Sequence, residues 1–281
     1  MTTMTSSPSW LQATSVAADR DASYLSVQGA RKTYDTRNGQ VHAVESADFD
    51  IDEGDFVSLV GPSGCGKSTL MSMIGGLESP SAGRIRVGGS PVTAPRRDFG
   101  YVFQDATLLP WKTVFDNVLF PIRTQKRPVA DYLAEAERLL RLTDLWAFRD
   151  KRPAELSGGM RQRVAICRGL INDPQLLMMD EPFSALDAIT RDDMNLALAQ
   201  LWDQVHKTAV FITHSIREAV FLSDRVLVMN ARPSRIVADI RVPFARPRRA
   251  EMQEEPLFNE ICGFVRDKIH EGHGSRQPAF A

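Results

Sequence analysis

The sequence predicts an α/β protein with a parallel β-sheet covered by helices on both faces, an antiparallel pair of strands and an inserted helical segment. Short apolar runs that end in polar residues alternate with segments of helical periodicity, which is typical of a buried parallel sheet. The clearest of these runs lie at 175–180, 208–213 and 225–230. A glycine-rich turn at 61–66 joins a further apolar run to a helix, which is a second indication of an α/β fold.

Charge balance and cysteine content argue against several classes of protein. The 281-residue chain has 34 basic and 35 acidic side chains and a formal net charge of -1, which disfavours a dedicated nucleic-acid-binding protein. Cys65, Cys167 and Cys262 are far apart and lack metal-ligand spacing, which indicates a reduced cytosolic chain rather than a disulfide framework. No run approaches the roughly 20 apolar residues of a membrane span, so we expect any work at a membrane to require a partner.

The first part of the chain is expected to begin with a disordered leader at residues 1–23. This stretch is rich in Ser, Thr and Ala and has no apolar run of signal-peptide length. Alternation of apolar and polar residues predicts antiparallel strands at 24–34 and 41–54. A short buried strand is predicted at 55–61, and an apolar helix at 68–77 follows the glycine-rich turn.

The rest of the chain shows helical spacing interrupted by strands. The predicted elements are helices at 131–149, 161–171 and 257–269 and a late strand at 235–242. We expect one domain at 24–249 that contains a helical subdomain at about 105–172, followed by a C-terminal helical tail at 250–281.

The glycine-rich turn matches the P-loop formula at every position and in the required strand–loop–helix context. Its residues are Gly61, Pro62, Ser63, Gly64, Cys65, Gly66, Lys67 and Ser68, followed by Thr69. Glycines let the backbone wrap a phosphate with its amide groups, and the positive end of the following helix adds to the attraction. Lys67 is expected to reach the β- and γ-phosphates and Ser68 to bind Mg²⁺. The Cys65 thiol is expected either to lie near the phosphates or to be an inert small side chain.

The acidic pair after the run at 175–180 supplies the second half of such a site. Asp180 is expected at the carboxyl end of a buried strand, where ligands of parallel sheets bind. There it would hold Mg²⁺, and Glu181 would orient or deprotonate an attacking water. An Asp-Glu pair alone would indicate no more than the start of a loop.

The helix at 161–171 is preceded by an unusual start, Ser157-Gly158-Gly159. A serine is explained by helix capping. Two glycines are not, because each costs a helix about 1 kcal/mol relative to alanine. A hydroxyl and exposed amide groups at the positive end of a helix form an anion site.

With this motif the sequence resembles the ATP-binding-cassette (ABC) ATPases, over roughly 24–249. The family's LSGGQ-type signature corresponds to Leu156 to Met160, with Met160 in place of the usual glutamine and Gln162 following. Further motifs of the family match in order. They are Tyr34, Gln104 in "YVFQD", Ser184 to Asp187 in "SALD", and His214 in "FITHS".

The resemblance implies a P-loop NTPase fold with an antiparallel β subdomain, a parallel-sheet core and an inserted helical subdomain. It implies ATP and Mg²⁺ as ligands and a head-to-tail dimer, in which Ser157, Gly158, Gly159 and Gln162 act in trans on ATP held by the partner. The other implied roles are adenine stacking by Tyr34, a Mg²⁺ contact by Gln104, an interface contact by Asp187 and a γ-phosphate contact by His214.

The type of cassette is indicated by what accompanies it. The short interval between Lys67 and Ser157 leaves no room for the coiled coils of chromosome-organising machines, and the chain has one cassette where translation-type factors usually have two. The apolar stretch at 104–122 favours a transporter, because in the family this surface receives a short cytoplasmic helix of a membrane permease. The alternatives are core packing for this stretch and a soluble, non-transport machine for the whole chain.

The stretches "LLPWKTVFDNV", "MDEPFSALDAITR" and "RPSRIVADIRVPFARPR" resemble the nitrate/sulfonate/taurine branch of bacterial importers. This implies an ATP-hydrolysing motor for uptake of a small anion, with a different solute as the alternative. The implied partners are a second ATP-binding subunit, expected to be an identical copy, a separate permease and an extracytoplasmic solute-binding protein, with no nucleic acid. The implied location is the cytoplasmic face of the inner membrane.

Overall fold

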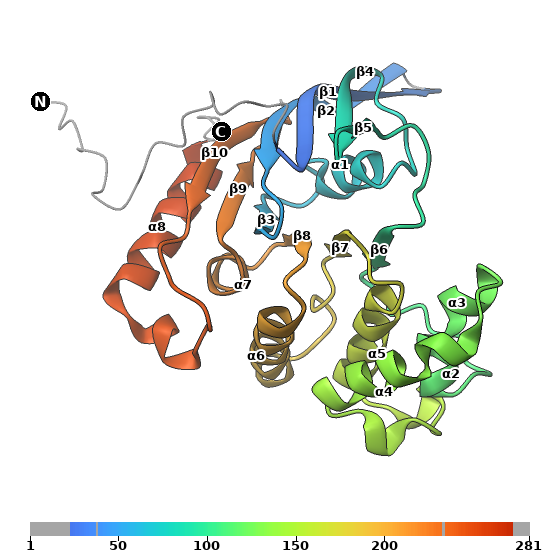
Figure 1. Cartoon of the computed structure of the whole chain (residues 1–281). Helices are drawn as coiled ribbons and strands as arrows, with labels where there is room; N and C mark the ends of the chain where they lie inside the picture. The colour runs from blue at the N-terminus through green and yellow to red at the C-terminus, as the bar shows by residue number, and fades with distance from the viewer. Residues whose placement is uncertain (1–22, 38, 232–233, 272–281) are drawn as a thin grey trace, which may run out of the picture.

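The computed structural model describes residues 23–37, 39–231 and 234–271. Two β-sheets with helices around them account for most of these residues (Figure 1). Apart from Ser23, the predicted leader lies outside the described residues, as does the end of the predicted tail at 272–281. No helix in the described ranges has both the length and the apolar character needed to cross a membrane.

The smaller sheet is antiparallel and has the order β2-β1-β4-β5. Its strands are β1 (Leu25–Thr36), β2 (Gly39–Ile51), β4 (Ala82–Val87) and β5 (Ser90–Pro91). In the register of β1 with β2, Leu25 lies opposite Ile51 and Tyr34 opposite Val41. The predicted antiparallel pair is therefore confirmed, whereas β4 and β5 were not predicted from the sequence.

The larger sheet has the order β10-β9-β3-β8-β7-β6. Its strands are β3 (Phe56–Val60), β6 (Phe99–Val102), β7 (Leu176–Asp180), β8 (Thr208–Thr213), β9 (Arg225–Met229) and β10 (Ile236–Arg241). Every neighbouring pair is parallel except β9 with β10. The parallel strands predicted from their apolar runs are thus present, and their carboxyl ends meet at one edge of the sheet.

Helices cover both faces of the larger sheet. The α-helices of the described residues are α1 (Lys67–Ile74), α2 (Val114–Val118), α3 (Phe120–Thr124), α4 (Leu133–Leu142), α5 (Gly158–Leu170), α6 (Ala188–Val205), α7 (Ile216–Leu222) and α8 (Pro256–Glu271). In Figure 1, α2 to α5 form a separate lobe next to β6. This lobe lies within the segment predicted as a helical subdomain, whose bounds stay a prediction.

Helix α1 lies between the two sheets. Its buried Leu70 and Ile74 belong to one apolar cluster with Leu25 of the smaller sheet and Leu59 of the larger one. A second cluster joins the opposite face of the larger sheet to helices α5 to α8. The start of α1 is therefore fixed from both sides, close to the carboxyl ends of the parallel strands.

The helix predicted at 131–149 is wrong in extent. Helix α4 ends at Leu142, and the chain around it forms short 3₁₀ turns at Val129–Tyr132 and Trp146–Phe148. Asp144 has a φ of 57°, a left-handed conformation that ends an α-helix. The final helix is longer than predicted, because α8 extends from Pro256 to Glu271.

The C-terminal helix packs into the same core as the rest of the chain. Phe258, Ile261 and Val265 of α8 are fully buried in the cluster that contains α7. From α7, Arg217 donates hydrogen bonds to Asn259 Oδ1 (3.1 Å) and to the carbonyl of Gln253 (3.0 Å). The domain end expected at residue 249 stays a prediction. Helix α8, which lies beyond this residue, packs into the same core as α7.

Candidate functional site

The glycine-rich loop runs from the end of β3 at Val60 to the start of α1 at Lys67. Gly66 precedes the helix with a φ of 97°, and a Cβ atom at this residue would lie 2.2 Å from the carbonyl oxygen of Ala43. Only glycine fits there. Among the described residues no side chain caps α1, so the N–H groups of its first turn stay available for an anion.

The ammonium group of Lys67 lies over this loop. It donates hydrogen bonds to the carbonyl oxygens of Gly61 (2.9 Å) and Pro62 (3.0 Å), and the side chain is buried. A cation and the free end of a helix thus lie at the same loop, which favours a ligand with several negative charges.

The side chain of Cys65 turns away from solvent into the cluster that surrounds α1. Burial raises the pKa of its thiol. Its Sγ nevertheless lies 3.9 Å from Lys67 Nζ, so both expectations for Cys65 stay predictions. Sequence reasoning could not choose between them, because the direction of a side chain in a tight loop is not visible in the motif.

Asp180 ends β7 next to the start of α1. Its Oδ1 accepts a hydrogen bond from the Ser68 hydroxyl (3.1 Å), which joins the loop to the acidic strand end as predicted. Burial raises the pKa of this carboxyl, and the Ser68 hydrogen bond opposes the effect. Hydroxyl and carboxylate oxygens are donors that Mg²⁺ prefers, and such sites take few protein ligands, so this pair fits the ion.

Glu181 has a backbone conformation that is rare for a residue with a side chain. Its φ is 45°, which costs about 1–3 kcal/mol. The strain is held by its N–H, which donates to the carbonyl of Ile212 (2.9 Å), and by Ser184, whose hydroxyl donates to the Glu181 carbonyl (2.9 Å). This conformation accompanies a 3.4 Å contact between Glu181 Oε2 and His214 Nδ1.

Gln104 lies beside Asp180 at a cavity of about 610 Å³ that Gly158, Arg161 and Leu186 also line. The backbone carbonyl of Gln104 accepts a 2.7 Å hydrogen bond from the side-chain amide of Gln162, and the Gln162 side chain is buried. The expected contact of Gln162 with a partner chain stays a prediction. Within this chain, Gln162 ties α5 to the segment after β6.

The start of α5 has the predicted cap and a second feature that the sequence did not reveal. Ser157 is exposed, and its Oγ accepts a hydrogen bond from the N–H of Met160 (3.2 Å). A Cβ atom at Gly159 would lie 2.9 Å from Cγ2 of Thr190, and one at Gly158 would lie 3.1 Å from Leu186. Close packing against Leu186 and the start of α6 thus explains why both Gly158 and Gly159 lack a side chain. A role of these glycines toward a partner chain is a separate prediction.

Comparison with known proteins identifies a family whose profile covers the residues of this site. The profile of the family described as "ABC transporter" matches residues 44–184, which include the loop, Gln104, the start of α5 and the acidic pair. The chain belongs to the ABC transporter family.

Its relatives cover nearly the whole chain. A taurine import ATP-binding protein of Rhizobium johnstonii is 44% identical and covers 91% of this chain and 100% of its own. A bicarbonate transport ATP-binding protein of Synechocystis is 37% identical over 89% of this chain and 90% of its own. A solved dimeric ATP-binding cassette with ADP and phosphate aligns with a TM-score of 0.68 and 30% identity over 79% of this chain and 100% of its own.

Two further residues expected from the ABC transporter family lie at the rim of the cassette. Asp187 caps α6, because its Oδ1 accepts from the N–H of Thr190 (3.0 Å) and its Oδ2 from the Thr190 hydroxyl (2.7 Å). Tyr34 is half-buried, and the Lys32 ammonium lies 5.0 Å from the centre of its ring. Their roles toward a partner and toward adenine stay predictions.

Arg168 of α5 is a residue of the site region that the sequence did not single out. Its guanidinium donates to the carbonyls of Ala106 (2.7 Å) and Thr107 (2.9 Å), so the α5 helix holds the segment after Gln104. Burial lowers the pKa of Arg168. No sequence signal separates this arginine from an ordinary helix-surface residue.

Proposed function

We propose that this chain is the ATP-hydrolysing subunit of a bacterial importer that moves a small anion through a separate membrane permease. One observation carries the proposal. Ser68 and Asp180 are joined beside the free end of α1, while Glu181 and His214 meet at the ends of the neighbouring strands. This edge of the sheet combines a phosphate cradle, oxygen ligands for a cation and an acid–base pair.

Within this site, the chain's own residues divide the work. The first-turn N–H groups of α1 and the Lys67 ammonium bind the phosphates. Ser68 and Asp180, with Gln104 at the neighbouring cavity, would hold Mg²⁺, which would supply positive charge to neutralise the phosphates. Glu181 orients a water molecule and accepts its proton, and His214 keeps Glu181 in place and contacts the γ-phosphate.

The functional unit is a head-to-tail dimer of identical chains. A two-fold arrangement lets the P-loop of one chain face the α5 start of the other, which makes two equal composite sites. Ser157 is exposed and therefore available to a partner, and the related cassette with ADP and phosphate is dimeric. Asp187 and Tyr34 complete the site at the interface and at the adenine.

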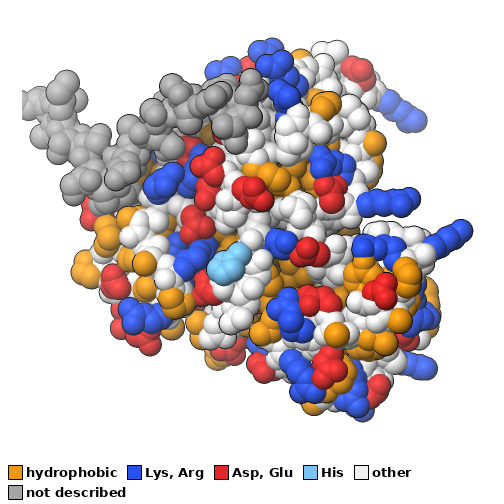
Figure 2. All heavy atoms as spheres, viewed as in Figure 1, with side chains coloured by type: hydrophobic (Ala, Val, Ile, Leu, Met, Phe, Trp, Pro, Cys, Tyr) orange, Lys and Arg blue, Asp and Glu red, His pale blue; other side chains and the backbone are white. Residues whose placement is uncertain are grey.

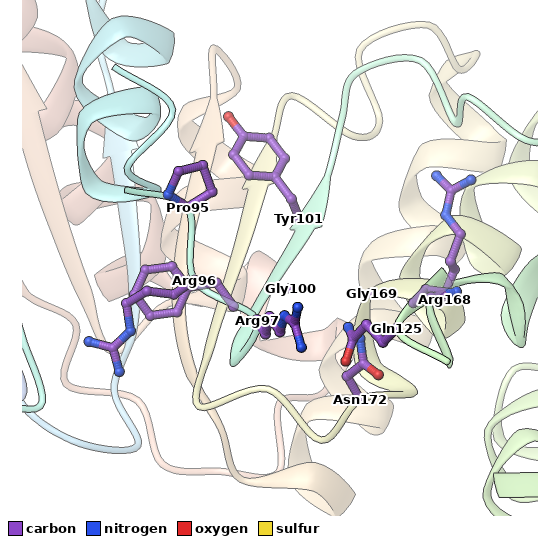
Figure 3. A pocket seen from close by; sticks show the side chains of 11 residues that line it. Pro95, Arg96, Arg97, Gly100, Tyr101, Gln125, Arg168, Gly169 and Asn172 are labelled. Carbon is purple, nitrogen blue, oxygen red and sulfur yellow. The ribbon is translucent and has the colours of Figure 1, made fainter. Parts of the chain in front are cut away.

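The permease docks where the helical lobe meets the edge of the sheet. A pocket of about 350 Å³ lies there between β6 and helices α3 and α5 (Figure 3). Arg97 projects into this pocket, whereas Arg96 turns away to bond Asp98. Asn172 Oδ1 is buried and lacks a hydrogen-bond partner among the residues described. A short cytoplasmic helix of the permease would dock over the mouth of this pocket.

Exposed apolar side chains within or beside the stretch at 104–122 extend the proposed docking surface. Trp111 and Phe103 are exposed over 66% and 42% of their surface, within or beside the predicted docking stretch at 104–122. Acidic and basic side chains are interspersed over the face drawn in Figure 2, with no broad field of one sign. The chain is thereby held at the cytoplasmic face of the membrane, and a solute-binding protein outside supplies the cargo.

The cargo is a small anion, of which a sulfonate such as taurine is the first candidate and nitrate the second. The relatives named for taurine and bicarbonate support the class. Deletion of the gene is expected to abolish growth on the transported sulfonate as sole sulfur source or on nitrate as sole nitrogen source. Restoration should require a plasmid copy with an intact Glu181. Normal growth and uptake on every anion tested would contradict the importer proposal for this class.

A further inference from the structure

Glu218 is a buried carboxylate that none of the roles above uses. It lies on α7, directly after the segment that contains His214, and only 5% of its surface is exposed. A buried carboxylate needs partners, because an isolated charge in the interior is strongly unfavourable. Its partners are Thr213 at the end of β8 and Arg191 on α6. They connect it to the segments that carry His214 and Glu181.

The first partner is the strand end that precedes His214. The hydroxyl of Thr213, the last residue of β8, donates a 2.6 Å hydrogen bond to Glu218 Oε2. The same hydroxyl accepts from the N–H of Ser215 (3.0 Å). Thr213 and Ser215 flank His214, so this bridge holds the backbone on both sides of the histidine.

The second partner is Arg191 on α6, whose Nε lies 3.5 Å from Glu218 Oε1. Arg191 also donates to the carbonyls of Leu186 (2.7 Å) and Phe183 (3.3 Å). These carbonyls belong to the turn that follows Glu181, in which Ser184 bonds the Glu181 carbonyl. Arg191 therefore connects the turn after Glu181 to the carboxylate of Glu218. The same carboxylate is hydrogen-bonded to Thr213, next to His214.

We infer that Glu218 and Arg191 are positioning residues that set the relative placement of Glu181 and His214 for ATP hydrolysis. This inference rests on the proposed function. Neither residue touches the reacting atoms. Replacement of a buried ion pair by apolar groups is often neutral for stability. We therefore expect Glu218 and Arg191 to contribute mainly to the geometry of the site and little to the free energy of unfolding. A displacement of about 1 Å at a reacting group can cost about 100-fold in rate.

The test is steady-state ATPase activity of the purified full-length chain. Glu218→Ala is expected to lower kcat by about 10-fold to 100-fold and to change KM for MgATP by less than about twofold, because the P-loop stays intact. Glu218→Gln should fall between wild type and Glu218→Ala, since its amide oxygen still accepts from Thr213. Arg191→Met should lower kcat, and the Glu218→Ala/Arg191→Met double variant should be little worse than either single one.

A milder pair of variants tests the same bridge without removing a charge. Thr213→Val should lower kcat at unchanged KM, and Thr213→Ser should restore it, because serine keeps the hydroxyl. The matched control is Asp239→Asn. Asp239 pairs with the buried Arg225, which begins β9 at the opposite end of the sheet from the site. This variant should lower the melting temperature but leave kcat unchanged.

Specific outcomes would overturn the inference. They are an unchanged kcat in Glu218→Ala and Thr213→Val, a parallel change of kcat and KM, or a loss of kcat in Asp239→Asn as large as in Glu218→Ala. Equal activity of Thr213→Val and Thr213→Ser would also contradict it. Absence of ATPase activity in the wild-type chain would instead contradict the proposed function.

Discussion

Glu181 has a strained backbone, and its carboxylate contacts His214. A substitution that changes only this carboxylate tests its role in hydrolysis directly. Glu181→Gln keeps the size of the side chain but removes the group that accepts a proton from water. We expect retained ATP binding, loss of hydrolysis and a dimer that persists with ATP in size-exclusion chromatography. Glu137→Gln, on the exposed face of α4, is the control. Normal turnover by Glu181→Gln would remove Glu181 from its role.

Lys67 places its ammonium group at the proposed phosphate-binding loop. Lys67→Ala should weaken MgATP binding by about 10-fold to 100-fold, because hydrogen bonds to a charged group contribute about 1.5–3 kcal/mol. Hydrolysis should be abolished. Equilibrium binding of a fluorescent nucleotide measures the first effect. Lys207→Ala removes a lysine that pairs with Asp173 on the surface and should leave affinity unchanged. An unchanged affinity in Lys67→Ala would contradict the assignment.

Cys65 is buried, and its pKa is raised, so the thiol forms thiolate only at a pH above the usual range for cysteine. Because thiolate is the reactive form, alkylation of the folded chain at pH 8 should be slow. Cys167 and Cys262 are buried as well. Mass spectrometry should therefore find little maleimide on the folded protein and full labelling in urea. Rapid labelling of Cys65 without denaturant would show that the loop opens.

Helix α5 links a motif to the packing of the next helix. Thr190→Ser deletes the Cγ2 atom that a Cβ at Gly159 would meet, yet keeps the hydroxyl that bonds Asp187. Gly159→Ala should therefore be more favourable by about 1–3 kcal/mol in the Thr190→Ser background than in wild type. Urea unfolding of the four proteins measures this coupling. Additive effects would show that the close approach is not a constraint.

This packing also decides how a role of α5 toward a partner should be tested. Bulk at Gly159 disturbs the chain itself, so a loss of activity in such a variant does not isolate contact with the partner's nucleotide. Ser157 is exposed, and its replacement by alanine removes a cap worth about 1 kcal/mol without a steric conflict. Ser157→Ala is therefore the cleaner variant.

Some elements could be predicted from the sequence because their physical requirements are local. Strands β7, β8 and β9 are buried on both faces and therefore have continuous apolar runs. Strand β4 was missed because its alternation of Arg84 and Arg86 with buried Ile85 and Val87 covers only four residues between glycines, and β6 because it is very short and contains Gly100.

The parts of the site that are contiguous in sequence could also be predicted. The P-loop is contiguous, and the acidic pair follows a recognisable strand, so Lys67, Ser68 and Asp180 were placed correctly near one another. Contacts between residues far apart in sequence left no such signal. Glu218 and Arg191 resemble ordinary charged residues of amphipathic helices, and only the packing of α6 against α7 brings them together.

At the scale of the whole molecule, α8 behaves as part of the cassette core. Phe258 is fully buried, and its ring packs near Phe244 with centroids 6.1 Å apart. Phe258→Ala should lower the free energy of unfolding by about 3–5 kcal/mol. Phe148→Ala, at a ring that is 38% exposed, should cost much less. Equal losses in the two variants, measured by urea unfolding, would mean that α8 is not integrated into the core.

The position of α1 between two sheets has a consequence for the influence of salt. Dissolved ions weaken attraction between charges across water beyond about 8 Å at physiological ionic strength, but they act poorly through a protein interior. Apolar side chains rather than water surround α1 along most of its length. The partial positive charge at its first turn, however, faces the exposed residues Gly64 and Ser68, where added salt screens it. Attraction of a polyanion to this loop from a distance should therefore weaken as the ionic strength rises, while the packing that holds the helix in place is unaffected.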